Sequence, residues 1–125
     1  MTKKILIVDD VMSMRHQVVR LLIDLGYVFE VEEAENGAAG LKMALKKDYD
    51  LFMIDWEMPV MNGLLLLREL KKNRRTKDTP TVMFTTKSQI ADVEKALSEG
   101  VDGYLTKPFS PEKLEFKVGK FLKSA

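Results

Sequence analysis

The chain has 125 residues, of which 46% are hydrophobic and 31% are charged. This balance fits one folded domain, residues 1–125, and does not favour a disordered chain. The formal net charge of +1 gives no general attraction to nucleic acid or to an anionic membrane, and the absence of cysteine excludes disulfides and thiolate metal sites. The apolar stretch 5–8 is too short for a signal peptide, and no run is long enough to span a bilayer, so we expect a cytoplasmic protein.

Strand and helix patterns alternate along the chain. Residues 5–8 form an apolar run typical of a strand buried on both faces, and the spacing over 12–25 predicts a helix that stops at Gly26. Further runs predict strands over 29–34, 51–54, 81–85 and around 104–105. Each is followed by a predicted helix, and these helices begin near Asn36, Gly63, Ser88 and Ser110.

The helix that Ser88 would cap is expected to turn Ile90, Val93 and Leu97 inward. Five such strand–helix units predict an α/β fold, a doubly wound (βα)5 sandwich in which helices cover both faces of a parallel sheet. In such sheets, ligands bind beyond the carboxyl ends of the strands, at the point where strand order reverses.

Polar residues follow four of the predicted strands at that rim. Asp9 and Asp10 follow the first strand, Asp55 the third, Thr85 ends the fourth and Lys107 follows the fifth. Taken singly, each has a structural explanation, such as a helix N-cap, a turn residue or a solvated lysine. No structural rule requires the whole set, however, so their joint occurrence indicates a reactive site.

The chemistry of this set points to phosphoryl transfer. Three neighbouring carboxylates need a cation among them, and oxygen ligands without nearby histidine or cysteine favour Mg²⁺. A lysine and a hydroxyl beside them can stabilise an anionic group in transit. A carboxylate can itself be the nucleophile, and we interpret Asp55 in this way.

The segments "ILIVDD", "IDWEMPVMNG", "FTTK" and "DGYLTKPF" together resemble one family across the whole chain. The family is the receiver (response-regulator) domains of two-component signalling, and the likeness is greatest to single-domain chemotaxis regulators. The resemblance implies a flavodoxin-like fold with strand order 2-1-3-4-5 and a phosphoacceptor signalling protein, not an enzyme with an external substrate.

The resemblance also implies a role for each site residue. Asp55 would accept the phosphoryl group. Mg²⁺ would be bound by Asp10, by Asp55 and by the backbone carbonyl of Glu57, with Asp9 helping through water. Lys107 would pair with the phosphoryl oxygens. Thr85 would donate its hydroxyl to the phosphoryl group, and Tyr104 would change rotamer as Thr85 moves.

Three residues near the predicted site depart from the chemotaxis pattern. Glu57 and Lys87 lie two places beyond Asp55 and Thr85, where that pattern has an amide and often an acid. We hypothesise that Glu57 and Lys87 form an ion pair across the entrance and slow self-dephosphorylation. Thr86 is bulkier than the small residue usual beside the switch threonine and would narrow access to the site.

Three other functions share parts of this pattern. A haloacid-dehalogenase-like phosphatase also places an acid two residues after its aspartate, but usually on the first strand of a longer chain. A flavodoxin-like cofactor binder would need a glycine-rich phosphate loop after the first strand, where "DDVMSM" stands instead. A degenerate receiver that acts only as a scaffold would lack one of the five site residues.

The expected partners are proteins. The resemblance implies a histidine kinase or phosphotransfer protein that docks near the first helix, and an output protein such as a flagellar switch component that binds the face of helix four, strand five and helix five. Because the sequence ends soon after helix five, we expect output through protein contacts, without nucleic acid or membrane. We expect a monomer, and phosphorylation could favour a weak dimer.

Overall fold

A computed structural model describes residues 2–123 of the chain. Its core is a five-stranded parallel sheet in the order β2-β1-β3-β4-β5. The predicted (βα)5 fold with strand order 2-1-3-4-5 is therefore confirmed. Within the described residues, no helix is both long enough and apolar enough to cross a membrane.

Strands and helices alternate without exception. The strands are β1 (Lys3–Val8), β2 (Phe29–Ala34), β3 (Leu51–Ile54), β4 (Thr81–Thr85) and β5 (Gly103–Thr106). The helices are α1 (Met12–Asp24), α2 (Gly37–Ala44), α3 (Gly63–Lys72), α4 (Ile90–Ser98) and α5 (Pro111–Leu122).

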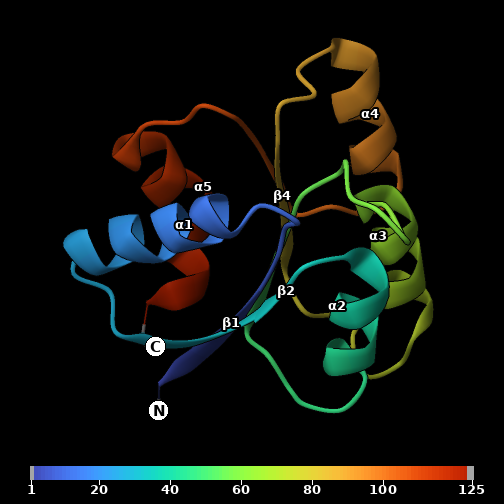
Figure 1. Ribbon diagram of the computed structural model, residues 1–125, viewed down its shortest axis with the longest axis horizontal. Helices are drawn as coiled ribbons and strands as arrows, with labels where there is room; N and C mark the ends of the chain where they lie inside the picture. The colour runs from blue at the N-terminus through green and yellow to red at the C-terminus, as the bar shows by residue number, and fades with distance from the viewer. Residues whose placement is uncertain (1, 124–125) are drawn as a thin grey trace.

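The two faces of the sheet carry separate hydrophobic cores. Helices α1 and α5 cover one face, where α1 contributes Val18 and Leu22 and α5 contributes Leu114 and Val118. Helices α2, α3 and α4 cover the opposite face, as Figure 1 shows. Because both faces are covered, strands β1, β3 and β4 read as continuous apolar runs and not as alternating ones.

Two predicted helix caps are confirmed and one is wrong. The side chains of Asn36 and Ser110 accept backbone N–H groups from the first turns of α2 and α5. Helix α4 does not begin at Ser88, since its N-cap is Gln89, which makes no side-chain cap hydrogen bond.

The predicted inner face of α4 is also wrong in part. Ile90 is 76% exposed and Leu97 is 55% exposed, whereas Ala96 is fully buried. Helix α4 therefore contacts the sheet through a small residue, and two of its large apolar side chains face outward. The hydrophobic spacing of the sequence could not distinguish these two orientations, because both have the helical period.

The loop between β3 and α3 is tightly closed. The N–H of Gly63 donates to the carbonyl of Trp56 at 2.7 Å, and a Cβ at Gly63 would overlap the carbonyl oxygen of Asp55. The N–H of Met61 donates to the carbonyl of Pro59, which makes a three-residue turn centred on Val60 at φ 70°. A β-branched residue in this conformation is strained, so the turn costs stability.

Replacing Val60 by glycine should therefore raise the free energy of unfolding. Relief of the left-handed conformation is worth about 1–2 kcal/mol, and the greater freedom of glycine in the unfolded chain offsets about 0.4–1 kcal/mol of it. Urea unfolding measures the difference. Val28→Gly is the matched control, because Val28 is equally exposed and lacks a positive φ. If both variants lose stability equally, Val60 is not strained.

Candidate functional site

The three acidic residues predicted for the site lie together. Asp9 and Asp10 directly follow β1, and Asp55 directly follows β3. These strands are neighbours, and the chain crosses to opposite sides of the sheet from them, so the site occupies the point where strand order reverses. Asp9 is fully buried and Asp55 is 7% exposed, whereas Asp10 is exposed.

Lys107 reaches both buried carboxylates from the end of β5. Its Nζ donates to Asp9 Oδ2 at 2.8 Å and lies 3.4 Å from Asp55 Oδ2. Only 11% of the lysine side chain is exposed, and the ammonium lies 4.8 Å from the centre of the Phe84 ring. The backbone positions Lys107 as well, because its N–H donates to the carbonyl of Thr85.

Backbone N–H groups hold the other carboxylate oxygens. The N–H of Val11 donates to Asp9 Oδ1 at 2.9 Å, and the N–H of Trp56 donates to Asp55 Oδ1 at 2.7 Å. Burial nevertheless raises the pKa of Asp55 above its usual range; Lys107 opposes that shift and Asp9 adds to it. Ionised Asp55 is thus less stable in the folded protein than in water, so its charge lowers stability at neutral pH.

The acidic cluster has the composition of a site for a hard cation. Asp9, Asp10 and Asp55 each offer a carboxylate oxygen, and the three oxygens lie within 4.8 Å of one another. Oxygen ligands, one of them on an exposed side chain open to water, suit Mg²⁺, which keeps several of its waters. One lysine does not neutralise three carboxylates, so the residues fit a bound divalent cation.

Thr85 and Tyr104 lie on adjacent strands beside this rim. Thr85 is fully buried at the end of β4, and its hydroxyl accepts from the N–H of Lys87 at 3.4 Å. Tyr104 is 9% exposed, and its hydroxyl donates to the carbonyl of Lys87 at 2.7 Å. Burial raises the pKa of Tyr104 to about 12, with Asp92 and Asp55 adding to the shift, so the phenol is neutral and can donate.

A pocket of about 490 Å³ opens over Asp55. Its other lining residues come from the loops at the rim and from the first turns of α1: Asp10, Val11, Met14, Gln17, Glu57, Thr86, Lys107, Pro108 and Phe109. Glu57 and Thr86 therefore lie at the mouth of the site. Lys87 is not among the lining residues.

The expected ion pair between Glu57 and Lys87 is not formed. The ammonium of Lys87 lies 5.3 Å from the centre of the Trp56 ring instead, and none of the ion pairs among residues 2–123 joins it to Glu57. The Trp56 ring, which is part of the tightly closed β3–α3 loop, attracts the cation without requiring two flexible side chains to meet. The pairing hypothesis was therefore wrong about the partner of Lys87.

Sequence reasoning missed Arg15, which contacts the backbone of the site from helix α1. Arg15 is on α1, is 9% exposed and donates to the backbone carbonyl of Asp9 at 2.6 Å. The signal in the sequence was an arginine among the helix positions that pack inward, directly after Met14 and one turn before Val18. That signal alone does not identify the acceptor.

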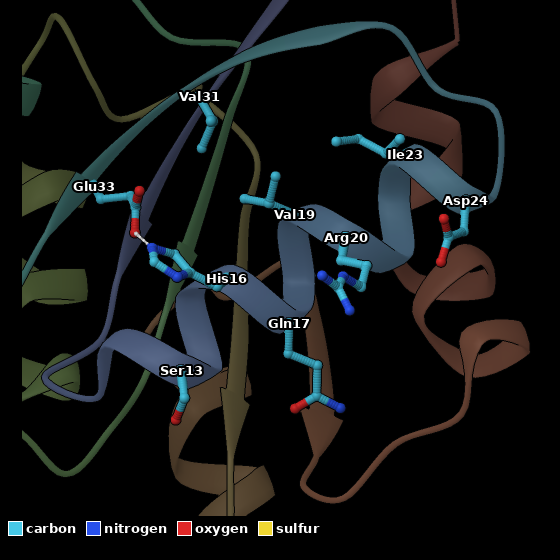
Figure 2. A pocket seen from close by; sticks show the side chains of 9 residues that line it. All are labelled: Ser13, His16, Gln17, Val19, Arg20, Ile23, Asp24, Val31 and Glu33. Atoms are coloured by element: carbon cyan, nitrogen blue, oxygen red, sulfur yellow. Dashed lines mark ion pairs between the residues drawn. The ribbon is translucent and has the colours of Figure 1, made fainter.

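A second, larger groove of about 750 Å³ runs along α1 and β2 (Figure 2). Val19, Ile23 and Val31 form its apolar part, and charged side chains of both signs surround them. It contains neither the acidic cluster nor Lys107. The chemistry predicted from the sequence therefore belongs to the smaller pocket over Asp55.

The fold and the site together define a class of protein: a doubly wound α/β protein with a buried carboxylate, a lysine and a cluster of acidic residues at the switch point of its sheet. The family model for the response regulator receiver domain matches residues 5–118 of the sequence, and the chain belongs to this family.

Relatives with similar sequences are chemotaxis proteins. The chain is 39% identical to chemotaxis protein CheY-3 of Vibrio cholerae over 117 residues, which cover 94% of this chain and 89% of that protein. It is 38% identical to chemotaxis protein CheY of Pseudomonas aeruginosa, with 94% of both chains covered. The high-resolution structure of the chemotaxis response regulator CheY4 of Vibrio cholerae matches with a TM-score of 0.86 and 34% identity, covering 98% of this chain and all of that one.

Proposed function

We propose that this receiver domain takes a phosphoryl group onto Asp55 and thereby switches its affinity for an output protein. The observation that carries the proposal is the pairing of a nearly buried Asp55 with Lys107, next to two further carboxylates. A structural turn residue needs neither the lysine nor the other acids. The protein would be a phosphoacceptor that phosphorylates and dephosphorylates itself, without turning over an external substrate.

Mg²⁺ would be held by Asp10, by Asp55 and by the backbone carbonyl of Glu57, with Asp9 acting through water. The bound cation would supply positive charge against the oxygens of the phosphoryl group. This assignment is supported by the mutual closeness of the three carboxylates and by their oxygen-only chemistry. Lys107 would supply a second positive charge, which moves from the carboxylates toward the phosphoryl oxygens.

In the transfer step, the Asp55 carboxylate attacks phosphorus in line with the leaving group. One carboxylate oxygen forms the new P–O bond as the P–N bond of a phosphohistidine breaks, and the imidazole departs with that electron pair. The N–H of Trp56 keeps the Oδ1 atom of Asp55 in place, so Oδ2, the oxygen nearer Lys107, is the available nucleophile. Water later cleaves the acyl phosphate and restores the carboxylate.

Thr85 and Tyr104 would carry the signal outward. Thr85 would donate its hydroxyl to the phosphoryl group, and Tyr104 would change rotamer in response. Thr85 and Tyr104 both hydrogen-bond to the backbone of Lys87. Movement of Thr85 would therefore act on the loop after β4. Such couplings are typically worth about 1–3 kcal/mol, so phosphorylation would shift a population of conformations without locking one.

The surface that responds would be α4, β5 and α5. Three large apolar side chains are exposed on its two helices: Ile90, Leu97 and Phe116. The relatives named above are chemotaxis proteins, which favours a chemotaxis or motility pathway. The partners would then be a histidine kinase or phosphotransfer protein that donates, and an output protein such as a flagellar switch component.

The proposal is tested by the mass of the intact protein after incubation with a small-molecule acyl phosphate. We expect a Mg²⁺-dependent gain of one phosphoryl group that is absent in Asp55→Asn. Asp50→Asn is the matched control, because Asp50 precedes β3 and therefore lies at the opposite end of the strand from Asp55. An adduct that persists in Asp55→Asn, or forms equally without Mg²⁺, would contradict the proposal.

We further propose that Glu57, Thr86 and Lys87 tune the access of water to the aspartyl phosphate. Their positions suggest unequal roles. Glu57 and Thr86 line the mouth of the pocket, whereas Lys87 is turned toward Trp56. Thr86 would therefore limit access directly, and Lys87 would act only by steadying the loop that carries it.

Thr86→Ala should accordingly shorten the lifetime of the aspartyl phosphate by about threefold, equivalent to ~0.6 kcal/mol of barrier. The decay of the adduct is followed by mass after removal of the donor. Lys87→Ala, its neighbour in the sequence, should change the lifetime less. If Lys87→Ala has the larger effect, the ammonium reaches the phosphoryl site and the proposed division of roles is wrong.

A further inference from the structure

Arg15 is a buried charge that the proposed phosphoryl transfer does not use. It lies on α1, one turn into the helix, and only 9% of the residue is exposed. Removing a guanidinium from water costs free energy unless strong partners replace the water. Arg15 has two such partners: its Nε donates to Glu33 Oε1 at 2.8 Å, and its Nη1 donates to the backbone carbonyl of Asp9 at 2.6 Å.

The second of these contacts acts on the acidic loop itself. The carbonyl of Asp9 belongs to the peptide group that joins Asp9 to Asp10, so its orientation sets the direction in which Asp10 leaves β1. Other hydrogen bonds fix Asp9, through its N–H to Ala34 and through its carboxylate to Val11 and Lys107. The side chain of Asp10, in contrast, takes part in none of the hydrogen bonds or ion pairs among residues 2–123.

We propose that Arg15 is a positioning residue for the metal site: by holding the Asp9–Asp10 peptide, it directs the Asp10 carboxylate toward Asp9 and Asp55. The inference rests on the proposed role of these acids in binding Mg²⁺. Groups that orient metal ligands without touching the metal typically contribute about 10–100-fold to metal affinity.

The two contacts require an arginine at position 15 and the carboxylate of Glu33 to hold it in place. The planar guanidinium presents donors at fixed angles. Its Nε can therefore bind Glu33 while its Nη1 binds the backbone carbonyl of Asp9. Glu33 comes from β2, the edge strand, and points toward α1, where it also lies 3.9 Å from His16 (Figure 2). A lysine has a single charged nitrogen and cannot hold both acceptors in this way.

A purely structural explanation is that Arg15 only fastens α1 to β2 through Glu33. The two explanations differ in what happens to Mg²⁺ binding. If Arg15 only fastens α1 to β2, its removal should lower the free energy of unfolding and leave the affinity for Mg²⁺ unchanged. If Arg15 positions the site, its removal should weaken Mg²⁺ binding even in protein that remains folded.

The experiment is a calorimetric titration of metal-free protein with Mg²⁺. We expect Arg15→Met to raise the dissociation constant for Mg²⁺ about tenfold. Arg68→Met is the matched control, because Arg68 forms an ion pair of similar length, 2.7 Å, with Glu99 on other elements. This variant should leave the dissociation constant within about twofold of wild type. At saturating Mg²⁺, the rate of adduct formation in Arg15→Met should recover to near the wild-type rate.

A second readout does not depend on the metal. In the metal-free protein, the amide resonance of Asp10 should shift or broaden in Arg15→Met and stay unchanged in Arg68→Met. Arg15→Lys, which keeps the charge, serves if the methionine variant does not fold, and should show the same effects at smaller size.

The outcomes distinguish failure of the proposed Mg²⁺ site from failure of the proposed positioning role of Arg15. If wild type binds no Mg²⁺, the proposed metal role fails, and the positioning of the loop is then judged by the Asp10 amide alone. If wild type binds Mg²⁺ and Arg15→Met binds it equally well, Arg15 does not position the site.

Discussion

The contact of Lys107 with Asp9 and Asp55 is the interaction on which the site depends. It joins the end of β5 to the ends of β1 and β3, so it brings together segments about 50 and 100 residues apart in the sequence. Two carboxylates this close would repel each other in a largely buried rim, and the ammonium between them offsets that repulsion. Because the lysine is itself mostly buried, the pair is screened far less than an ion pair on the surface.

Lys107 neutralises the carboxylates only in part, and this affects the stability of the site. One ammonium faces three carboxylates, and burial raises the pKa of Asp55. The site is therefore less stable than it would be with neutral residues, and such a cost is typical of functional sites. A divalent cation would relieve this excess of negative charge. In the proposed transfer, the same lysine would then be available for the phosphoryl oxygens, because Asp9 and Asp55 would no longer depend on it alone.

Much of the fold and the site could be predicted from the sequence. The strands that are buried on both faces read as apolar runs, and each run ends at a residue of the site, so the position of Asp55 followed from the end of its strand. The features that sequence reasoning missed depend on contacts between distant segments. The face that α4 turns inward depends on whether Ala96 or its larger neighbours pack on the sheet. The partner of Lys87 depends on where the Trp56 ring lies, and the acceptor of Arg15 is a backbone carbonyl, which no sequence pattern reveals.

The central role of the Lys107 contact is tested most directly by a double-mutant cycle on Lys107 and Asp55, measured as free energies of unfolding without metal. Lys107→Met should cost about 3 kcal/mol in the wild-type background, because it leaves two buried carboxylates without their cation. The same change should cost clearly less in an Asp55→Asn background, where one of the two carboxylates is already neutral. Equal losses in the two backgrounds would mean that Lys107 does not interact with Asp55, and would contradict the central role given to this contact.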